Sequence, residues 1–299
     1  MRQLLRLLVI TLTLAGCADP VAPADDAGLE ADAAMPSDAA MSFDAAVPLD
    51  AAMGDAGGSS GAQVFVHLVA THDAVDHLPS TSGQTPRDWV SGIRSLHLMR
   101  SETDPTPFLV FSHGDGFVEA SYADGADTIV GSRPIAELEP GVYAWARVVH
   151  THVRFTIDAT LHAGFGPMPG ALEDFIALSD RTTALGRTWS QGDYRTVFTT
   201  AGRSFPAEGT GYTWPSVPGG GFTTRVEDGE TAFYFPAPLV VDDTLSDDVH
   251  LIFTVNVHEG FRWTDQPTTD YADGVFDVTT VSTEPIVQAG ANAYTYTVR

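Results

Sequence analysis

The stretch that decides the fold is VYAWARVVHTHVRFTI, residues 142–157. Apolar and polar residues alternate along most of it, and valine, aromatic and threonine residues are frequent. Both features are typical of a β-strand with one face against a core. Pro140-Gly141, directly before it, indicates the turn from which this strand starts.

The same period of two recurs along the chain. It predicts further strands at 64–72, 93–99, 108–112, 117–122, 194–200, 231–236, 250–258 and 293–299. Turn pairs lie between them, at Asp115-Gly116, Asp124-Gly125, Asp228-Gly229 and Asp273-Gly274. Only PGALEDFIALSD, residues 169–180, has a helical rhythm, and it predicts a short helix or an ordered loop. We therefore expect an all-β protein, an antiparallel β-sandwich or two packed sandwiches.

The folded part is expected to begin at residue 62. Residues 62–157 are predicted to form a β-sandwich domain, and residues 158–299 a second β-rich domain or a continuation of the first. Leu138-Glu139-Pro140-Gly141-Val142-Tyr143 resembles the L-x-P-G-x-Y turn that leads into the last strand of transthyretin-like sandwiches. Such sandwiches occur in bacterial surface lipoproteins.

The first residues indicate export. Arg2 and Arg6 precede the apolar run of residues 7–15, which is too short to span a bilayer and is typical of a signal peptide, residues 1–16. Leu14-Ala15-Gly16-Cys17 resembles the bacterial lipobox. The resemblance implies that Cys17 is acylated and anchors the protein in a lipid bilayer. Ala18 stands where an aspartate would imply retention in the inner membrane, so the resemblance favours the outer membrane of the cell envelope.

Residues 17–61 carry the lipidated cysteine and a tether. The segment repeats DAAMPS, DAAMSF, DAAVPL and DAAMGD, and it has acidic residues without lysine or arginine. Pro36 and Pro48 interrupt any helix, and the like charges repel, so we expect a disordered spacer. It is similar to the spacers behind the lipobox in lipoproteins of myxobacteria and their relatives.

The composition excludes several functions. With 39 acidic and 15 basic residues the net charge is −24, which argues against binding to nucleic acid. The chain has no lysine, so Schiff-base chemistry and a P-loop are excluded. Its single cysteine excludes an intramolecular disulfide and a thiolate metal cluster.

Histidines suggest a zinc or copper site. His150 and His152 are two apart on a predicted strand, which puts both on one face together with Arg154. His72 and His77, with Asp73 and Asp76, follow the first predicted strand. The first pair lacks a third ligand fixed by local spacing, so its alternative is a packed strand face. The second set could surround a cation or support an acid–base pair, and its alternative is a solvated loop.

Carboxylates suggest a calcium site. WTDQPTTDYADGVFD, residues 263–277, contains Asp265, Asp270, Asp273 and Asp277. Their spacing does not match a calcium loop of the EF-hand type, so a hairpin turn at Asp273-Gly274 is the first interpretation and calcium the second.

The sequence contains no recognised catalytic motif. The leading hypothesis is a membrane-anchored envelope lipoprotein with an all-β binding or structural module, whose partner is an envelope protein or a glycan. Aromatic residues in turn-rich segments are candidates for such binding, or else parts of the core: Trp189, Tyr212, Trp214, Trp263 and Tyr271. The alternatives are a metal-dependent hydrolase using zinc or calcium, and a calcium-dependent carbohydrate-binding module.

Overall fold

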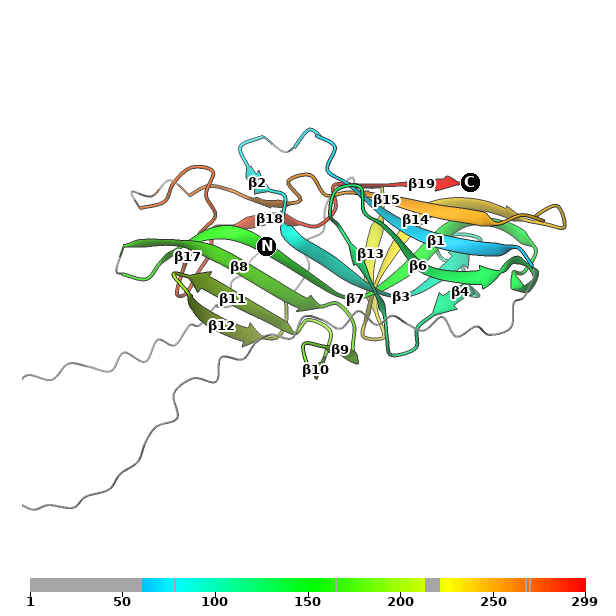
Figure 1. Ribbon diagram of the computed structural model, residues 1–299, viewed down its shortest axis with the longest axis horizontal. Helices are drawn as coiled ribbons and strands as arrows, with labels where there is room; N and C mark the ends of the chain where they lie inside the picture. Colours follow the sequence, from blue (N-terminus) through cyan, green and yellow to red (C-terminus); the bar gives the residue numbers. More distant parts are fainter. Residues whose placement is uncertain (1–60, 78, 165, 213–220, 267, 269) are drawn as a thin grey trace, which may run out of the picture. The chain divides into compact units, whose positions relative to one another are not determined.

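The fold is built around one long central strand, β7 (Gly141–His162), in a computed structural model of the protein (Figure 1). The structure describes residues 61–77, 79–164, 166–212, 221–266, 268 and 270–299. The predicted signal peptide, Cys17, the tether up to Ser60 and Trp214 lie outside the described residues. The described part of the chain contains no helix with the length and apolar character needed to cross a membrane.

The larger sheet has ten strands. Its main path runs through β12 (Arg203–Gly209), β11 (Tyr194–Thr200), β8 (Pro167–Ala177), β7, β14 (Glu230–Val241) and β13 (Thr223–Glu227). Off this path β7 also pairs with β17 (Asp277–Thr279) and β3 (Arg87–Met99), and β3 pairs with β4 (Phe108–Ser112) and β5 (Val118–Ser121). The sheet thus takes strands from most of the folded sequence.

A four-stranded sheet packs against it, in the order β19 (Ala293–Val298), β15 (Val249–Asn256), β1 (Gln63–Thr71) and β6 (Asp127–Pro134). A three-stranded sheet consists of β18 (Ile286–Ala289), β16 (Phe261–Trp263) and β2 (Ser82–Gln84). β9 (Thr182–Ala184) and β10 (Arg187–Trp189) pair as a small ribbon, and Ile135–Glu137 form one short 3-10 turn, η1. The prediction of an all-β sandwich is confirmed.

The core lies between the ten-stranded and the four-stranded sheets. Alternate residues of β1 point into it, from Val64 to Ala70. Phe235 of β14 meets Phe253 of β15 and Tyr294 of β19 there, with ring centroids 5.7 and 4.6 Å apart. The hydrophobic period of two in the sequence therefore corresponds to burial of one face of each sheet.

Strands from both ends of the sequence share these sheets. β7 passes through residues 157 and 158 without a break, and residues 61–299 belong to one unit of contacts. Most pairs are antiparallel, but β1 and β15 are parallel, with Thr71 beside Asn256 at their carboxyl ends. Because these two strands end at the same edge of the sheet, the loops that follow them meet.

The helical interpretation of residues 169–180 is wrong, because this segment contains most of β8. Leu172 and Ile176 face the main core while Phe175 packs against Trp189 on the other side, so both faces of β8 are apolar. Asp174 adds a carboxyl group on the Leu172 face, where it accepts a hydrogen bond from Thr196. A strand buried on both faces loses its alternation, and its apolar residues then imitate a helical spacing.

A β-bulge interrupts the central strand. Gly92 of β3 pairs with His152, whereas the next residue, Ile93, pairs with His150, so Thr151 is the extra residue on β7. Before the bulge the even-numbered residues Ala146 and Val148 face the core, and after it the odd-numbered residues from Val153 onward face it. A methyl group on Gly92 would lie 2.2 Å from Thr151 Oγ1, so only glycine fits opposite the bulge.

Candidate metal centre

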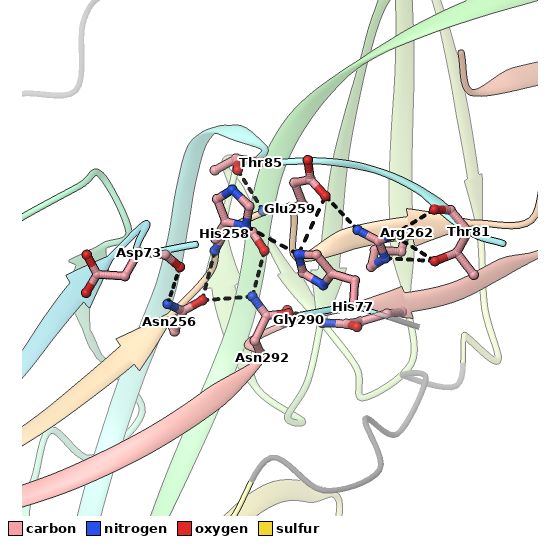
Figure 2. Close-up of polar contacts among 11 residues, drawn as sticks. Asp73, His77, Thr81, Thr85, Asn256, His258, Glu259, Arg262, Gly290 and Asn292 are labelled. Atoms are coloured by element: carbon pink, nitrogen blue, oxygen red, sulfur yellow. Dashed lines mark hydrogen bonds and ion pairs between the residues drawn. The ribbon is translucent and has the colours of Figure 1, made fainter. Parts of the chain in front are cut away.

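The loop after β1 separates the two histidines that the sequence grouped together. The imidazole Nε2 of His72 bonds to the Tyr122 carbonyl oxygen at 2.9 Å. His77 lies instead beside His258 and Glu259, in the loop that follows β15 (Figure 2). The predicted group of His72 and His77 is therefore not assembled, and His77 takes part in a different one.

His77, His258 and Glu259 converge on one point. His77 Nε2 is 3.3 Å from His258 Nδ1 and 3.5 Å from Glu259 Oε2. Among the residues that the structure describes, they form the one group of three His, Cys, Asp or Glu side chains whose ligating atoms all lie within 4.8 Å of one another. A tetrahedral zinc ion with ligands at about 2.0–2.1 Å holds them about 3.3–3.4 Å apart, so the spacing fits such an ion.

A charged side chain holds the carboxylate. Arg262 Nη1 donates to Glu259 Oε2 at 2.7 Å, and the guanidinium also donates to the hydroxyl and carbonyl oxygens of Thr81 (Figure 2). The Arg262 guanidinium and His77 Nε2 contact the same carboxylate oxygen of Glu259, Oε2. Arg262 is buried, so it is fixed in place.

The backbone of Glu259 is in an unusual conformation. Its φ is +44°, the left-handed region that residues other than glycine seldom adopt. The Thr85 hydroxyl accepts a hydrogen bond from its amide at 2.7 Å and holds it there. Six other non-glycine residues of the described chain share this region, and Glu259 adopts it in the turn that the Gly260 amide closes on the Val257 carbonyl oxygen at 3.0 Å.

Two asparagines hold His258. Asn256 Oδ1 accepts from the His258 amide at 3.2 Å, and Asn292 Nδ2 donates to the His258 carbonyl at 2.6 Å. Asn256 Nδ2 also donates to the Asp73 carbonyl at 2.8 Å, which connects this loop to the loop of His77. The parallel pairing of β1 with β15 and these bonds bring the two loops together.

The electrostatics favour a neutral imidazole at His77. Burial lowers the pKa of His77 below its ordinary value, and the Arg262 guanidinium adds to this effect, while Glu259 opposes it. A ligating imidazole must be unprotonated, and burial favours this state of His77, although the Arg262 guanidinium repels a bound cation as it repels a proton. Nitrogen and carboxylate donors in this combination are typical of zinc, whereas calcium takes oxygen ligands.

The expectation that His150 and His152 share a face is wrong. His150 bonds through Nδ1 to Ser91 Oγ at 2.7 Å and packs on Phe233 in the core between the sheets. His152 stacks on Phe175 and lies 3.4 Å from Glu119, on the other side of the sheet. The bulge at Thr151 reverses the alternation between them, so within the described residues they build no common metal site.

The four aspartates of the proposed calcium loop do not converge within the described residues. Asp265 accepts hydrogen bonds from Ser82, Trp263 and Gly274. Asp277 is buried against His162, whereas Asp270 and Asp273 are exposed. The predicted hairpin is also wrong: Asp273-Gly274 form a turn, but β16 before it pairs with β18 and β2, and β17 after it pairs with β7.

The aromatic candidates belong mainly to the interior. Trp189 and Trp263 are fully buried, and the Trp189 indole donates to the Ala184 carbonyl. Tyr271 packs against the His162 ring, and Tyr212 lies near Tyr194. The two tryptophans are therefore core residues and not a stacking surface for a ligand.

Sequence reasoning missed His258 and Glu259. They follow β15 in VNVHEGFRW, without a spacing that connects them to His77, which is 181 residues away from His258. The pairing of β1 with β15 was the missing information. No family model, no curated protein and no solved structure matches this chain.

Proposed function

We propose that this protein is a lipid-anchored envelope protein whose β-sandwich binds zinc through His77, His258 and Glu259. The observation that carries the proposal is the convergence of two imidazoles and a carboxylate at separations of 3.3 and 3.5 Å. Two histidines and a glutamate are an established zinc ligand set in proteins. The hydrogen bonds around both loops support a site that is ordered before the ion arrives.

Zinc titration tests the metal site. The full-length protein, purified in detergent and freed of metal with EDTA, is expected to bind one zinc ion in isothermal titration calorimetry. Zinc at 100 times its dissociation constant should stabilise the fold by about 2.7 kcal/mol in thermal unfolding. His258→Ala should weaken binding by about 100-fold or more, because losing even a partner of a ligand costs about 10–100-fold.

His72→Ala is the matched control, since His72 lies in the same loop as His77 but bonds to the Tyr122 carbonyl. It should keep the affinity of the unchanged protein. Absence of saturable zinc binding in the unchanged protein would refute the proposal, and so would equal affinities of His258→Ala and His72→Ala.

The anchor is tested at Cys17. The proposal of lipid attachment rests on Leu14-Ala15-Gly16-Cys17 at the end of the apolar leader. Several acyl chains at about 0.8 kcal/mol per buried methylene would hold the protein firmly in a bilayer. In bacterial cells, Cys17→Ser should abolish incorporation of labelled palmitate and shift the protein from the outer-membrane fraction to soluble fractions. If the unchanged protein incorporates no labelled palmitate, the proposed lipid anchor is wrong.

A further inference from the structure

We propose that the zinc ion at this site keeps a fourth coordination position open to solvent, where it exchanges bound water for carboxylate oxygens. This inference rests on the proposed function and names the class of ligand that the site takes. The exchange is a simple substitution: one metal–water bond breaks, one metal–carboxylate bond forms, and the water leaves.

The number of protein ligands supports an open position. The group contains three ligating residues among those that the structure describes. Structural zinc sites are closed by four protein ligands, whereas sites that react keep three and leave one position for water or substrate. His77, His258 and Glu259 therefore match the open class.

The exposure of the ligands places the open position toward solvent. The Glu259 side chain is 40% exposed, while His77 is 12% exposed and Arg262 is 5% exposed. The buried side of the site is thus filled by Arg262 and Thr81, and the accessible side lies at the carboxylate. A small ligand can approach the ion without movement of the sheets.

The loops do not need the ion to hold them. Asn256, Asn292 and Thr85 already bond to the backbone of His258 and Glu259, and Asn256 connects that loop to Asp73. A structural zinc ion supplies folding free energy that the chain lacks without it. Here hydrogen bonds order the loops without the ion, so the ion can exchange the ligand in its fourth position.

The charge of the site favours an anion. A divalent ion with two neutral imidazoles and one carboxylate keeps a net positive charge, and the Arg262 guanidinium lies 2.7 Å from Glu259 Oε2. Carboxylate oxygens are accepted zinc ligands at about 2.0–2.2 Å. The open position is therefore expected to take small carboxylates, and carboxylate-bearing molecules of the envelope belong to this class.

Cobalt(II) makes the position visible, because its visible absorption depends on the number and kind of its ligands. The full-length protein in detergent is loaded with cobalt(II) and titrated with sodium acetate, with sodium perchlorate at equal ionic strength as the control salt. We expect a saturable change in the position and intensity of the cobalt absorption with acetate and none with perchlorate. His72→Ala should respond in the same way, and His258→Ala should lack the cobalt spectrum.

Two failures are distinguishable. A bound cobalt ion whose spectrum acetate leaves unchanged would overturn the open position and leave the zinc site standing. Absence of a protein-bound cobalt spectrum, together with absence of zinc binding by calorimetry, would overturn both proposals. A response to perchlorate equal to that to acetate would also overturn the carboxylate preference.

Discussion

Acidification from pH 6.5 to pH 4 is expected to lower the free energy of unfolding by about 3 kcal/mol through His150 alone. Burial, with a smaller effect of His152, lowers the pKa of His150 from 6.5 to about 3. Below pH 6.5 the unfolded chain takes up a proton at this residue and the folded chain does not. Stability therefore falls by about 1.4 kcal/mol per pH unit until the folded pKa is reached.

His97 acts in the same direction. Burial first and the Arg147 guanidinium second lower the pKa of His97 to about 4, against an opposite effect of Glu230. Its contribution to stability is likewise lost as the pH falls from about 6.5 to about 4. Since whole domains are stable by only about 5–15 kcal/mol, the two histidines make the fold sensitive to acid.

Urea unfolding at pH 7 and pH 4 measures this effect. In His150→Asn the amide nitrogen still reaches Ser91 Oγ but cannot titrate, so the difference in stability between the two pH values should shrink by about 3 kcal/mol. If the stability difference between pH 7 and pH 4 is the same in His150→Asn and in the unchanged protein, His150 is not the source of the acid sensitivity.

Asp174→Asn is a control of opposite sign. Burial raises the pKa of Asp174 to about 6; the hydrogen bond from Thr196 lowers this pKa, and the neighbouring Glu173 carboxylate raises it. Between about pH 6 and pH 3.8 the folded protein therefore binds a proton at Asp174 and the unfolded chain does not. This uptake offsets part of the loss of stability that the histidines cause on acidification. Removing the carboxyl group should make the loss of stability on acidification larger.

Asp277→Ala is expected to cost about 1–3 kcal/mol of stability at pH 7, the range for leaving buried hydrogen-bonding groups without their partner. Asp277 is 1% exposed, and its carboxylate meets His162 Nε2 at 2.7 Å and the Ala272 amide at 3.0 Å. The substitution leaves both groups without this acceptor and opens a space beside Glu284, whose carboxylate accepts from the Asp277 amide.

Asp273→Ala is the matched control in the same segment. Asp273 is exposed at its turn, so the change should stay within about 0.5 kcal/mol. Urea unfolding at pH 7, repeated with millimolar calcium, measures both variants, and calcium should not alter the difference between them. Similar losses for the two substitutions would contradict the structural role of the buried Asp277 carboxylate. A calcium effect that disappears in Asp273→Ala would show that the acidic segment binds calcium.

Several features of the fold were predictable because they depend on neighbours in the sequence. The period of two located β1, β7, β14, β15 and β19. Asp228-Gly229 turns β13 into β14 with φ of +51° and +76°, as a two-residue hairpin requires. The β8 segment failed because both of its faces are buried, so the local pattern that distinguishes a strand from a helix was absent.

The candidate site was predictable only in part. His77 was named from its position after the first strand, but its partners His258 and Glu259 come from the loop after β15. His150 and His152 were assigned to one face because regular alternation was assumed, and the bulge at Thr151 reverses it. Residues far apart in the chain meet through strand pairing, which leaves no local signal at either end.

By itself, the sequence determined that this protein is built of strands, and it identified histidines rather than the single cysteine as candidate zinc ligands. Periodicity and composition are local properties, and burial of one sheet face follows from them. The tertiary structure alone decided which loops meet, because the parallel pairing of β1 with β15 joins segments about 180 residues apart. Such pairing is selected by the free energy of the whole packed core, and no short stretch of sequence records it.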